Sequence, residues 1–204
     1  EVTRISLFIN NIDFADYRIS EKEYLEFKKK GKLPNGKIAP FRQLPVLEID
    51  GKIIGQTCAI ARFCGKISGM YPTNNDINAG KIDQILDAAQ DINYIITLSG
   101  KDKKKEVRKI TRERLVNVHL PKWFQFLENL LIENKESEWF VGKSMTIADI
   151  AIWRLLGWIK SGKLDDVPTN ILKPYNNITK MREKISKHPK IIDWMLKKYG
   201  KELD

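Results

Sequence analysis

The spacing of apolar residues predicts that the chain begins in a helix. These residues recur at helical intervals, and the pattern predicts a helix over residues 1–11. They are Val2, Ile5, Phe8, Ile9 and Ile12. Because Glu1 already falls within this amphipathic pattern, the chain as given is expected to start inside a domain.

The next segment predicts a strand, a second helix and a loop. Residues 14–19 alternate between apolar and polar well enough to predict a strand. Ser20 and Glu23 have the spacing of a capping box, in which each side chain accepts a free backbone N–H of the other residue, so a helix is expected to begin there. Residues 31–41 contain glycines and prolines at short intervals and predict a loop.

A hairpin followed by a helix is predicted after this loop. Residues 44–49 read as a strand, and residues 52–54 return antiparallel to it. Asp50 and Gly51 form the turn, because both positions of such a turn need positive φ. The following helix is expected to run to about Ser68 and to be closed by Gly69.

The second half of the chain shows long amphipathic helix patterns and no further good strand pattern. Residues 76–99 predict one helix. Residues 105–134 predict another, which Pro121 would kink or mark as a tight contact. Thr146 and Asp149 have capping spacing and predict the start of a third. Two more helices follow, the last with a proline in its first turn.

The change in pattern divides the chain into two parts. The first, residues 1–69, is expected to be a small α/β domain, and the second, residues 76–204, an all-helical domain. The segment between them carries proline and asparagine and reads as a linker. The predicted fold class is therefore α/β plus all-α.

The strongly basic composition raises the question of a nucleic-acid partner. The formal net charge is +10, which is compatible with nucleic-acid binding. The lysines are nevertheless spread over the chain, and the one dense run, residues 103–105, has no aromatic neighbour on which bases could stack. No nucleic-acid partner is expected.

Cysteine and histidine positions argue against redox and metal chemistry. Cys58 and Cys64 lie in one predicted helix, too far apart to bond easily, so a reducing cytoplasmic setting is the default. His119 and His188 lie near prolines at helix kinks or ends without metal-ligand spacing, so they read as structural and no metal is expected. There is no apolar run long enough to span a membrane, and no membrane partner is expected.

The hairpin and the helix after it would leave two sets of backbone groups free beside each other. Pro45 opens the first strand, and Gln56 and Thr57 open the helix. The N–H groups and dipole at a helix start favour an anion, and an exposed strand edge can pair with an extended peptide. A small peptide with a carboxylate would fit both. The alternatives are that Thr57 only caps the helix and that Cys58 is a small buried filler.

These residues resemble the glutathione S-transferase family, nearest its sigma class, which includes glutathione-dependent prostaglandin D synthases. The resemblance covers nearly the whole chain and implies a thioredoxin-like N-terminal domain, with its first strand upstream of Glu1, followed by an all-helical domain. It also implies a cis bond before Pro45, which would turn the N–H and C=O of Leu44 toward a bound peptide. The stretches that carry it are EVTR at 1–4, QLPVLEIDG at 43–51, QTCAIARF at 56–63 and MTIAD at 145–149.

The resemblance implies that glutathione is a co-substrate held by the hairpin and the helix start. Gln56 and Thr57 would bind the γ-glutamyl carboxylate. Leu44, followed by Pro45, would pair with the cysteinyl backbone, and Gln43 would add a side-chain contact. An ordinary strand residue is the alternative for Leu44.

Three further contacts are implied at the other ends of glutathione. Lys28 and Tyr24 would meet the glycyl carboxylate, although the family more often has tryptophan where Tyr24 stands. Asp91 would reach the γ-glutamyl amine of a partner subunit, which implies a homodimer. Solvated surface charges are the alternatives for Lys28 and Asp91. The loop at 29–41 is longer than is usual in the family and puts Lys28 most in question.

The resemblance leaves the catalytic residue outside the chain. In the sigma class a tyrosine at the end of the first strand donates a hydrogen bond to the glutathione sulfur, and this residue is expected upstream of Glu1. Tyr17 and Tyr24 follow the first helix and are poor substitutes. Ile95, Ile96 and Leu98 are candidate liners of the second substrate's pocket, with core packing as the alternative.

The sequence thus predicts a cytoplasmic, homodimeric glutathione transferase with a role in detoxification. It would activate the glutathione thiol for attack on small hydrophobic electrophiles. One alternative is a glutathione-dependent prostaglandin isomerase with the same site. The other is a non-catalytic binding or structural module that keeps the fold, as a crystallin does.

Overall fold

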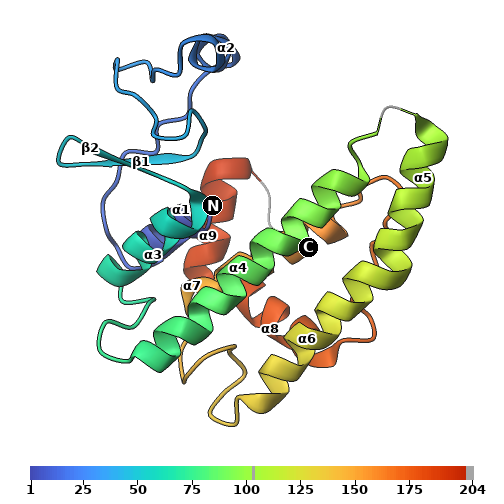
Figure 1. Cartoon of the computed structure of the whole chain (residues 1–204). Coiled ribbons are helices and arrows are strands. Elements are labelled where there is room, and N and C mark those ends of the chain that lie inside the picture. The colour runs from blue at the N-terminus through green and yellow to red at the C-terminus, as the bar shows by residue number, and fades with distance from the viewer. Residues whose placement is uncertain (103, 201–204) are drawn as a thin grey trace.

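The computed structural model describes residues 1–102 and 104–200, so Lys103 of the dense lysine run lies outside it. A small α/β unit comes first and lies at one end of the molecule, as Figure 1 shows. Its elements are α1 (Val2–Ile9), α2 (Glu21–Lys30), β1 (Val46–Ile49), β2 (Lys52–Gly55) and α3 (Thr57–Ile67).

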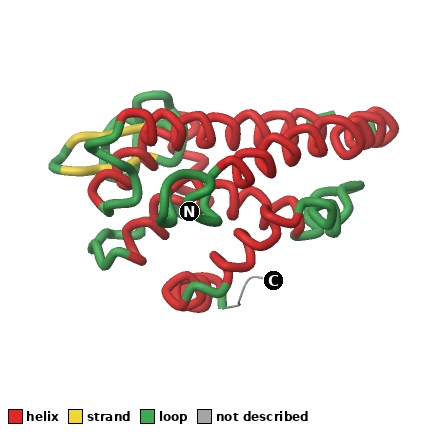
Figure 2. The backbone as a smooth tube through the Cα atoms, turned by 90° about the horizontal axis from the view of Figure 1, so that it is seen from below, coloured by secondary structure: helices red, strands yellow, loops and turns green. Residues whose placement is uncertain are grey.

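A larger helical unit follows. Figure 2 shows its long helices running beside one another, away from the hairpin. Its elements are α4 (Asp76–Ser99), α5 (Lys105–Arg114), the π-helical turn η1 (Leu115–His119), α6 (Leu120–Glu133), α7 (Ile147–Lys160), α8 (Asn176–Ser186) and α9 (Pro189–Tyr199).

The hairpin forms as its turn signal predicts. β1 and β2 pair antiparallel, from Val46 opposite Gly55 to Ile49 opposite Lys52. Asp50 and Gly51 have φ values of 48° and 74°, the positive values that a tight hairpin turn requires. The two strands form a sheet of their own within the described residues.

Residues 14–19 do not form the predicted strand. A strand needs a neighbour that pairs with its N–H and C=O groups, and none of the described strands lies beside this segment. Side-chain ion pairs hold it instead, because the carboxylate of Asp16 lies 2.5 Å from Nε of Arg4 in α1 and 3.3 Å from Nζ of Lys198 in α9.

The predicted helix over 105–134 is interrupted. α5 and α6 are separated by η1, in which the N–H of Leu120 donates to the carbonyl of Leu115. Pro121 follows directly and has no N–H to donate, and such π turns accommodate a local mismatch in the helical hydrogen bonds. The kink expected at Pro121 therefore takes the form of a π turn just before it.

The structure confirms both capping boxes that the sequence predicts. Ser20 and Glu23 form a complete capping box at the start of α2, and Thr146 and Asp149 form one at the start of α7. Pro189 stands in the first turn of α9. Local side-chain chemistry thus sets the starts of these helices.

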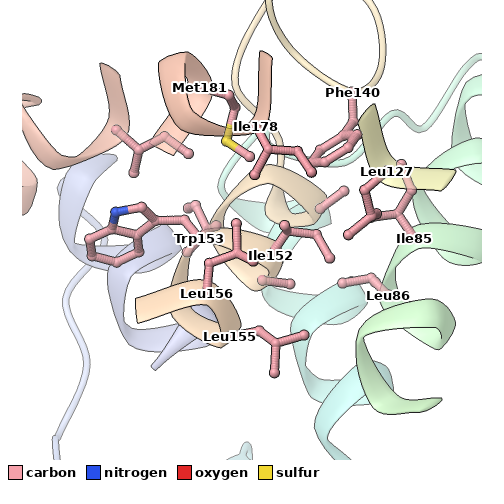
Figure 3. Packing of buried hydrophobic residues seen from close by; sticks show 14 of the residues in the cluster. Ile85, Leu86, Leu127, Phe140, Ile152, Trp153, Leu155, Leu156, Ile178 and Met181 are labelled. Carbon is pink, nitrogen blue, oxygen red and sulfur yellow. The ribbon is translucent and has the colours of Figure 1, made fainter. Parts of the chain in front are cut away.

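The main core is built around α7, which is buried on most of its surface. Figure 3 shows Ile152, Trp153 and Leu156 of this helix among side chains of the surrounding helices, such as Ile85 and Met181. Because the same buried cluster includes residues of α1 as well as of the helical unit, the small unit is held against α7. The predicted division at 1–69 and 76–204 stays a prediction.

Candidate functional site

The hairpin register brings the two predicted halves of the peptide site together. Val46 pairs with Gly55, so Leu44 and Pro45 lie at the same open end of the hairpin as Gln56 and Thr57. The peptide bond between Leu44 and Pro45 is cis. Leu44 is 37% exposed and makes no backbone–backbone hydrogen bond within the described residues. Its N–H and C=O are therefore open to a ligand.

The start of α3 presents free donors beside this backbone. Gln56 is the residue that precedes the first helical position, and it has φ 72° without a capping side-chain hydrogen bond. Positive φ is costly for a residue other than glycine and often marks a functional site. The capping alternative for Thr57 is wrong, since Thr57 is the first residue of the helix and its side chain is exposed. An anion can therefore approach the first-turn N–H groups.

Tyr24 and Lys28 lie on α2, away from α3 in Figure 1. Tyr24 is 43% exposed and its ring stacks on Phe27 with centroids 6.4 Å apart. Lys29 and Lys30 pair with Glu26, whereas Lys28 is exposed and makes no ion pair within the described residues. Lys28 is thus available for an anion, but the structure does not bring it against the start of α3.

The long loop between α2 and β1 is fastened to the hairpin. Lys37 forms an ion pair with Glu48 of β1. Nδ2 of Asn35 donates to the same carboxylate at 2.8 Å, and Nζ of Lys37 also reaches the carbonyl of Gly51 at 3.2 Å. The loop thus lies along the far end of the hairpin. Gln43, at its end, is exposed.

Asp91 lies on α4 with an exposed side chain. It makes no ion pair or side-chain hydrogen bond within the described residues. Successive residues of a helix differ by about 100° in direction, so Asp91 faces away from the side of α4 that carries Leu86 and Asn93. That side lines the cavity described next. Asp91 is free to meet another molecule, but it does not join the other candidate residues in this chain.

A cavity of about 280 Å³ lies where α1, α3, α4 and α7 meet. Thr57 and Cys58 contribute from α3, Gln90 and Asn93 from α4, and Arg154 from α7. Thr57 therefore borders both the free helix start and this cavity. The candidate liners Ile95, Ile96 and Leu98 are not among the residues that surround it, and Ile96 is a fully buried core residue.

The two thiols in this region are held as thiols. Sγ of Cys58 lies 3.7 Å from the carbonyl of Leu86, to which it donates, and burial raises its pKa. Burial alone raises the pKa of Cys64 to about 11. A thiolate is the reactive form, so neither cysteine has the environment of a nucleophile.

Sequence reasoning missed the contributions of Gln56's backbone and of α7. The positive φ of Gln56 has no glycine or asparagine to signal it. Arg154 did carry a signal, because it is the one charged residue in the otherwise apolar run 150–159. A lone cation in a buried helix is often placed at a site.

Comparison with known proteins shows to which family this chain belongs. The family model for the C-terminal domain of glutathione S-transferases matches residues 90–198. A glutathione S-transferase of Plasmodium yoelii yoelii is 32% identical over 79% of this chain and 73% of its own length. The chain belongs to the glutathione S-transferase family. The predicted resemblance is thereby confirmed.

Other proteins similar to this chain are named for different roles. The S-crystallin SL11 of Nototodarus sloanii is 28% identical over 97% of this chain and 90% of its own. The structure of prostaglandin synthase D of Nilaparvata lugens superposes with a TM-score of 0.81 at 24% identity, covering 97% and 91% of the two chains. This similarity confirms the predicted fold, a small α/β unit followed by an all-helical one.

Among the described residues of this family member, no group of histidine, cysteine and carboxylate side chains could hold a metal ion. None of its described helices is long and apolar enough to cross a membrane.

Proposed function

We propose that this protein is a glutathione transferase of the sigma class, active in the cytoplasm as a homodimer and serving detoxification. Its reaction would be attack of the glutathione sulfur on a small hydrophobic electrophile. The observation that supports this most is the hairpin register, which places the unpaired backbone of Leu44 beside the free start of α3.

In the proposed complex, each part of glutathione would bind a different group of the protein. The γ-glutamyl carboxylate would take the N–H groups at the start of α3 and the hydroxyl of Thr57. The cysteinyl N–H and C=O would pair with Leu44 as an added strand, with Gln43 beside it. Gln56 would supply a further polar contact. The cavity behind Thr57 and Cys58 would then lie next to the sulfur and receive the second substrate.

The outer contacts of glutathione remain part of the proposal. Lys28, which makes no ion pair within the described chain, would meet the glycyl carboxylate together with Tyr24. Asp91 would reach the γ-glutamyl amine in a partner subunit. The thiol has a pKa near 8.5–9 in water, and a hydrogen bond to sulfur would lower it. No tyrosine or histidine is among the described residues that line the cavity.

Substitution of Thr57 tests this assignment. T57A should weaken glutathione binding about tenfold, because it removes a donor to a charged group. T57S should stay within about threefold of the parent, since it keeps the hydroxyl. Isothermal titration with glutathione measures both affinities. T169A, an exposed threonine in another loop, is the matched control and should leave binding unchanged. Absence of glutathione binding in the parent protein would contradict the proposal.

The relatives suggest two other functions that the same preparation can separate. A prostaglandin isomerase would rearrange its substrate in the presence of glutathione without consuming it. A crystallin-like module would show no turnover, with or without glutathione binding. Conjugation of glutathione to chlorodinitrobenzene, followed by absorbance, supports the transferase over the crystallin-like module. Rearrangement of a prostaglandin substrate with no loss of glutathione would favour the isomerase instead.

A further inference from the structure

The end of the helical unit where α4 passes into α5 is strongly basic. Residues 101–109 contain six basic and two acidic residues, so they carry +4 of the chain's net charge of +10. Figure 1 shows the start of α5 at the far side of the molecule from the hairpin. The name α4–α5 corner is used below for residues 101–110. A large share of the net charge is thus gathered at one projecting end.

The exposed cations of the α4–α5 corner have no carboxylate partner. The lysines that the structure shows as exposed there form no ion pair within the described residues. They are Lys101, Lys104, Lys105 and Lys109. Arg108 donates to the backbone carbonyl of Asp102 at 3.1 Å, which leaves its charge unpaired as well. The positive potential of the corner is therefore available to an anionic partner.

Other lysine-rich segments of the surface are neutralised in part. Lys29 and Lys30 of α2 lie 3.8 Å and 2.8 Å from Glu26. Lys184 of α8 lies 2.7 Å from Glu138. Such exposed pairs add little to stability, but they cancel charge that would otherwise attract an anion. The α4–α5 corner differs from these segments because its charge is not cancelled from within the chain.

The inner face of α5 is fixed to the end of α4. The hydroxyl of Thr111 donates to the carbonyl of Ser99 at 2.7 Å. Nη1 of the buried Arg112 donates to Oγ of Ser99 at 2.8 Å and to the carbonyl of Ile96 at 3.1 Å. Gly100 leaves room for this guanidinium, since a Cβ there would lie 2.5 Å from Nη2 of Arg112. Helix α5 is thereby held with its other face outward.

Aliphatic side chains accompany the cations on that outer face. Val107 is 39% exposed and Ile110 is 66% exposed. The two lie three residues apart on α5, so their side chains are neighbours on its surface. No aromatic residue on which a nucleic-acid base could stack occurs in residues 101–114. Exposed aliphatic groups among basic residues are typical of a surface that enters the headgroup region of a bilayer.

The shape of the α4–α5 corner also favours a bilayer over a protein partner. A stable protein partner would cover about 800 Å² of this chain, whereas the corner is the projecting end of a helix. Anionic lipids diffuse within their leaflet and can gather around a small convex surface. Each basic residue near such a leaflet strengthens binding about fivefold.

We propose that the α4–α5 corner docks peripherally on an anionic lipid bilayer, with its lysines over the headgroups and Val107 and Ile110 among them. This contact differs from crossing the membrane, for which no described helix is long and apolar enough. The lack of a spanning run led to the expectation of no membrane partner, but a peripheral contact needs no such run. The docking does not rest on the proposed transferase function.

Sedimentation with lipid vesicles tests the role of charge. Phosphatidylcholine vesicles with about 30% phosphatidylserine should bind the protein at about 0.1 M salt, and pure phosphatidylcholine vesicles should not. K104Q/K105Q/K109Q should weaken binding about 100-fold. The control K52Q/K81Q/K143Q removes the same charge from exposed lysines that form no ion pair within the described chain. It should weaken binding less than about threefold, because distant charges are screened.

Substitution of Ile110 tests the aliphatic part of the contact. I110S should weaken vesicle binding about tenfold, and this ratio should not change between about 0.1 M and 0.2 M salt, because burial of an apolar group is not screened. I77S changes an isoleucine of α4 that is 74% exposed, and it should bind as the parent does. Thermal unfolding checks that each variant is folded. If the triple variant is unfolded, K104Q and K109Q alone, each with an expected loss of about fivefold, decide in the same way.

Several outcomes would overturn the inference. The parent protein could bind neither kind of vesicle or both alike, K52Q/K81Q/K143Q could lose as much as K104Q/K105Q/K109Q, or I110S could bind as tightly as the parent. Binding to duplex DNA that depends on the corner lysines but not on Ile110, without vesicle binding, would identify nucleic acid as the partner. Sedimentation without vesicles would indicate association between copies of this chain. Titration with glutathione is independent, so a failure to dock leaves the transferase proposal intact.

Discussion

Asp149 shows how one residue can serve local folding and the core together. Its side chain is fully buried at the start of α7. It accepts hydrogen bonds from the N–H groups of Phe140 and Thr146 at 2.9 Å and 2.7 Å, and from the Thr146 hydroxyl at 2.8 Å. Burial raises its pKa to about 6, although these hydrogen bonds oppose the shift.

The raised pKa of Asp149 predicts a pH-dependent contribution to stability. The folded protein binds a proton at Asp149 more readily than the unfolded chain, so this residue's contribution to the free energy of unfolding falls as pH rises from about 4 to 6 and is constant above. The free energy of unfolding of the parent minus that of D149N should fall by about 1 kcal/mol between about pH 5 and pH 8. Urea unfolding at several pH values measures it. A difference that rises over this range would contradict the prediction.

At the scale of elements, a carboxylate of one helix caps another far along the chain. Glu128 of α6 is 8% exposed. One of its oxygens accepts from the N–H and Nδ2 of Asn177, both at 2.8 Å, and the other accepts from the N–H of Ile178 at 2.9 Å. These are the free N–H groups at the start of α8, which has no side-chain cap of its own.

Removal of this cap should destabilise the helical unit. E128A leaves two backbone donors without an acceptor and should lower the free energy of unfolding by about 2 kcal/mol. E128Q retains an acceptor oxygen and should lose about half as much. E113A, at an exposed site on α5, should change stability by less than about 0.5 kcal/mol. Denaturant unfolding followed by circular dichroism compares the three; equal losses in E128A and E113A would rule out the capping role.

At the scale of the whole molecule, α1 is a shared part of both units. Ile5 is fully buried and belongs to the same cluster as the core residues of α7 and α9. The ring of Phe8 lies 5.1 Å from that of Trp194 in α9, measured between centroids. A continuous buried cluster is expected to unfold cooperatively.

Truncation of the Ile5 side chain should therefore lower the stability of both units. I5A should lower the free energy of unfolding by about 3 kcal/mol, through lost burial and the cavity left behind. Hydrogen exchange of the α7 amides should become faster by the corresponding factor. I38A, at a side chain that is 64% exposed, should change neither quantity appreciably. If I5A leaves exchange in α7 unchanged, the two units unfold independently.

The candidate site was predictable where its residues are neighbours in sequence. The hairpin, predicted at 44–54 and found at 46–55, and the helix start at Gln56 and Thr57 follow from turn and strand patterns, so their closeness could be expected. Asp91 and Lys28 could only be proposed through the family resemblance, and the structure leaves both exposed and apart from the helix start. Arg154 was not predicted to lie at the site, because the apolar sequence of α7 is typical of a core helix.

The sequence by itself determined the local structure of this protein: the hairpin turn, the capping boxes, the long helix at α4 and the break before Pro121. These depend on hydrogen bonds and backbone preferences within a few residues. Tertiary structure alone decided that residues 14–19 form no strand, that Glu128 caps α8, and that Arg154 faces an open cavity. Each depends on which distant groups become neighbours, and a pairing partner, an acceptor or an empty space is not encoded within the segment that needs it.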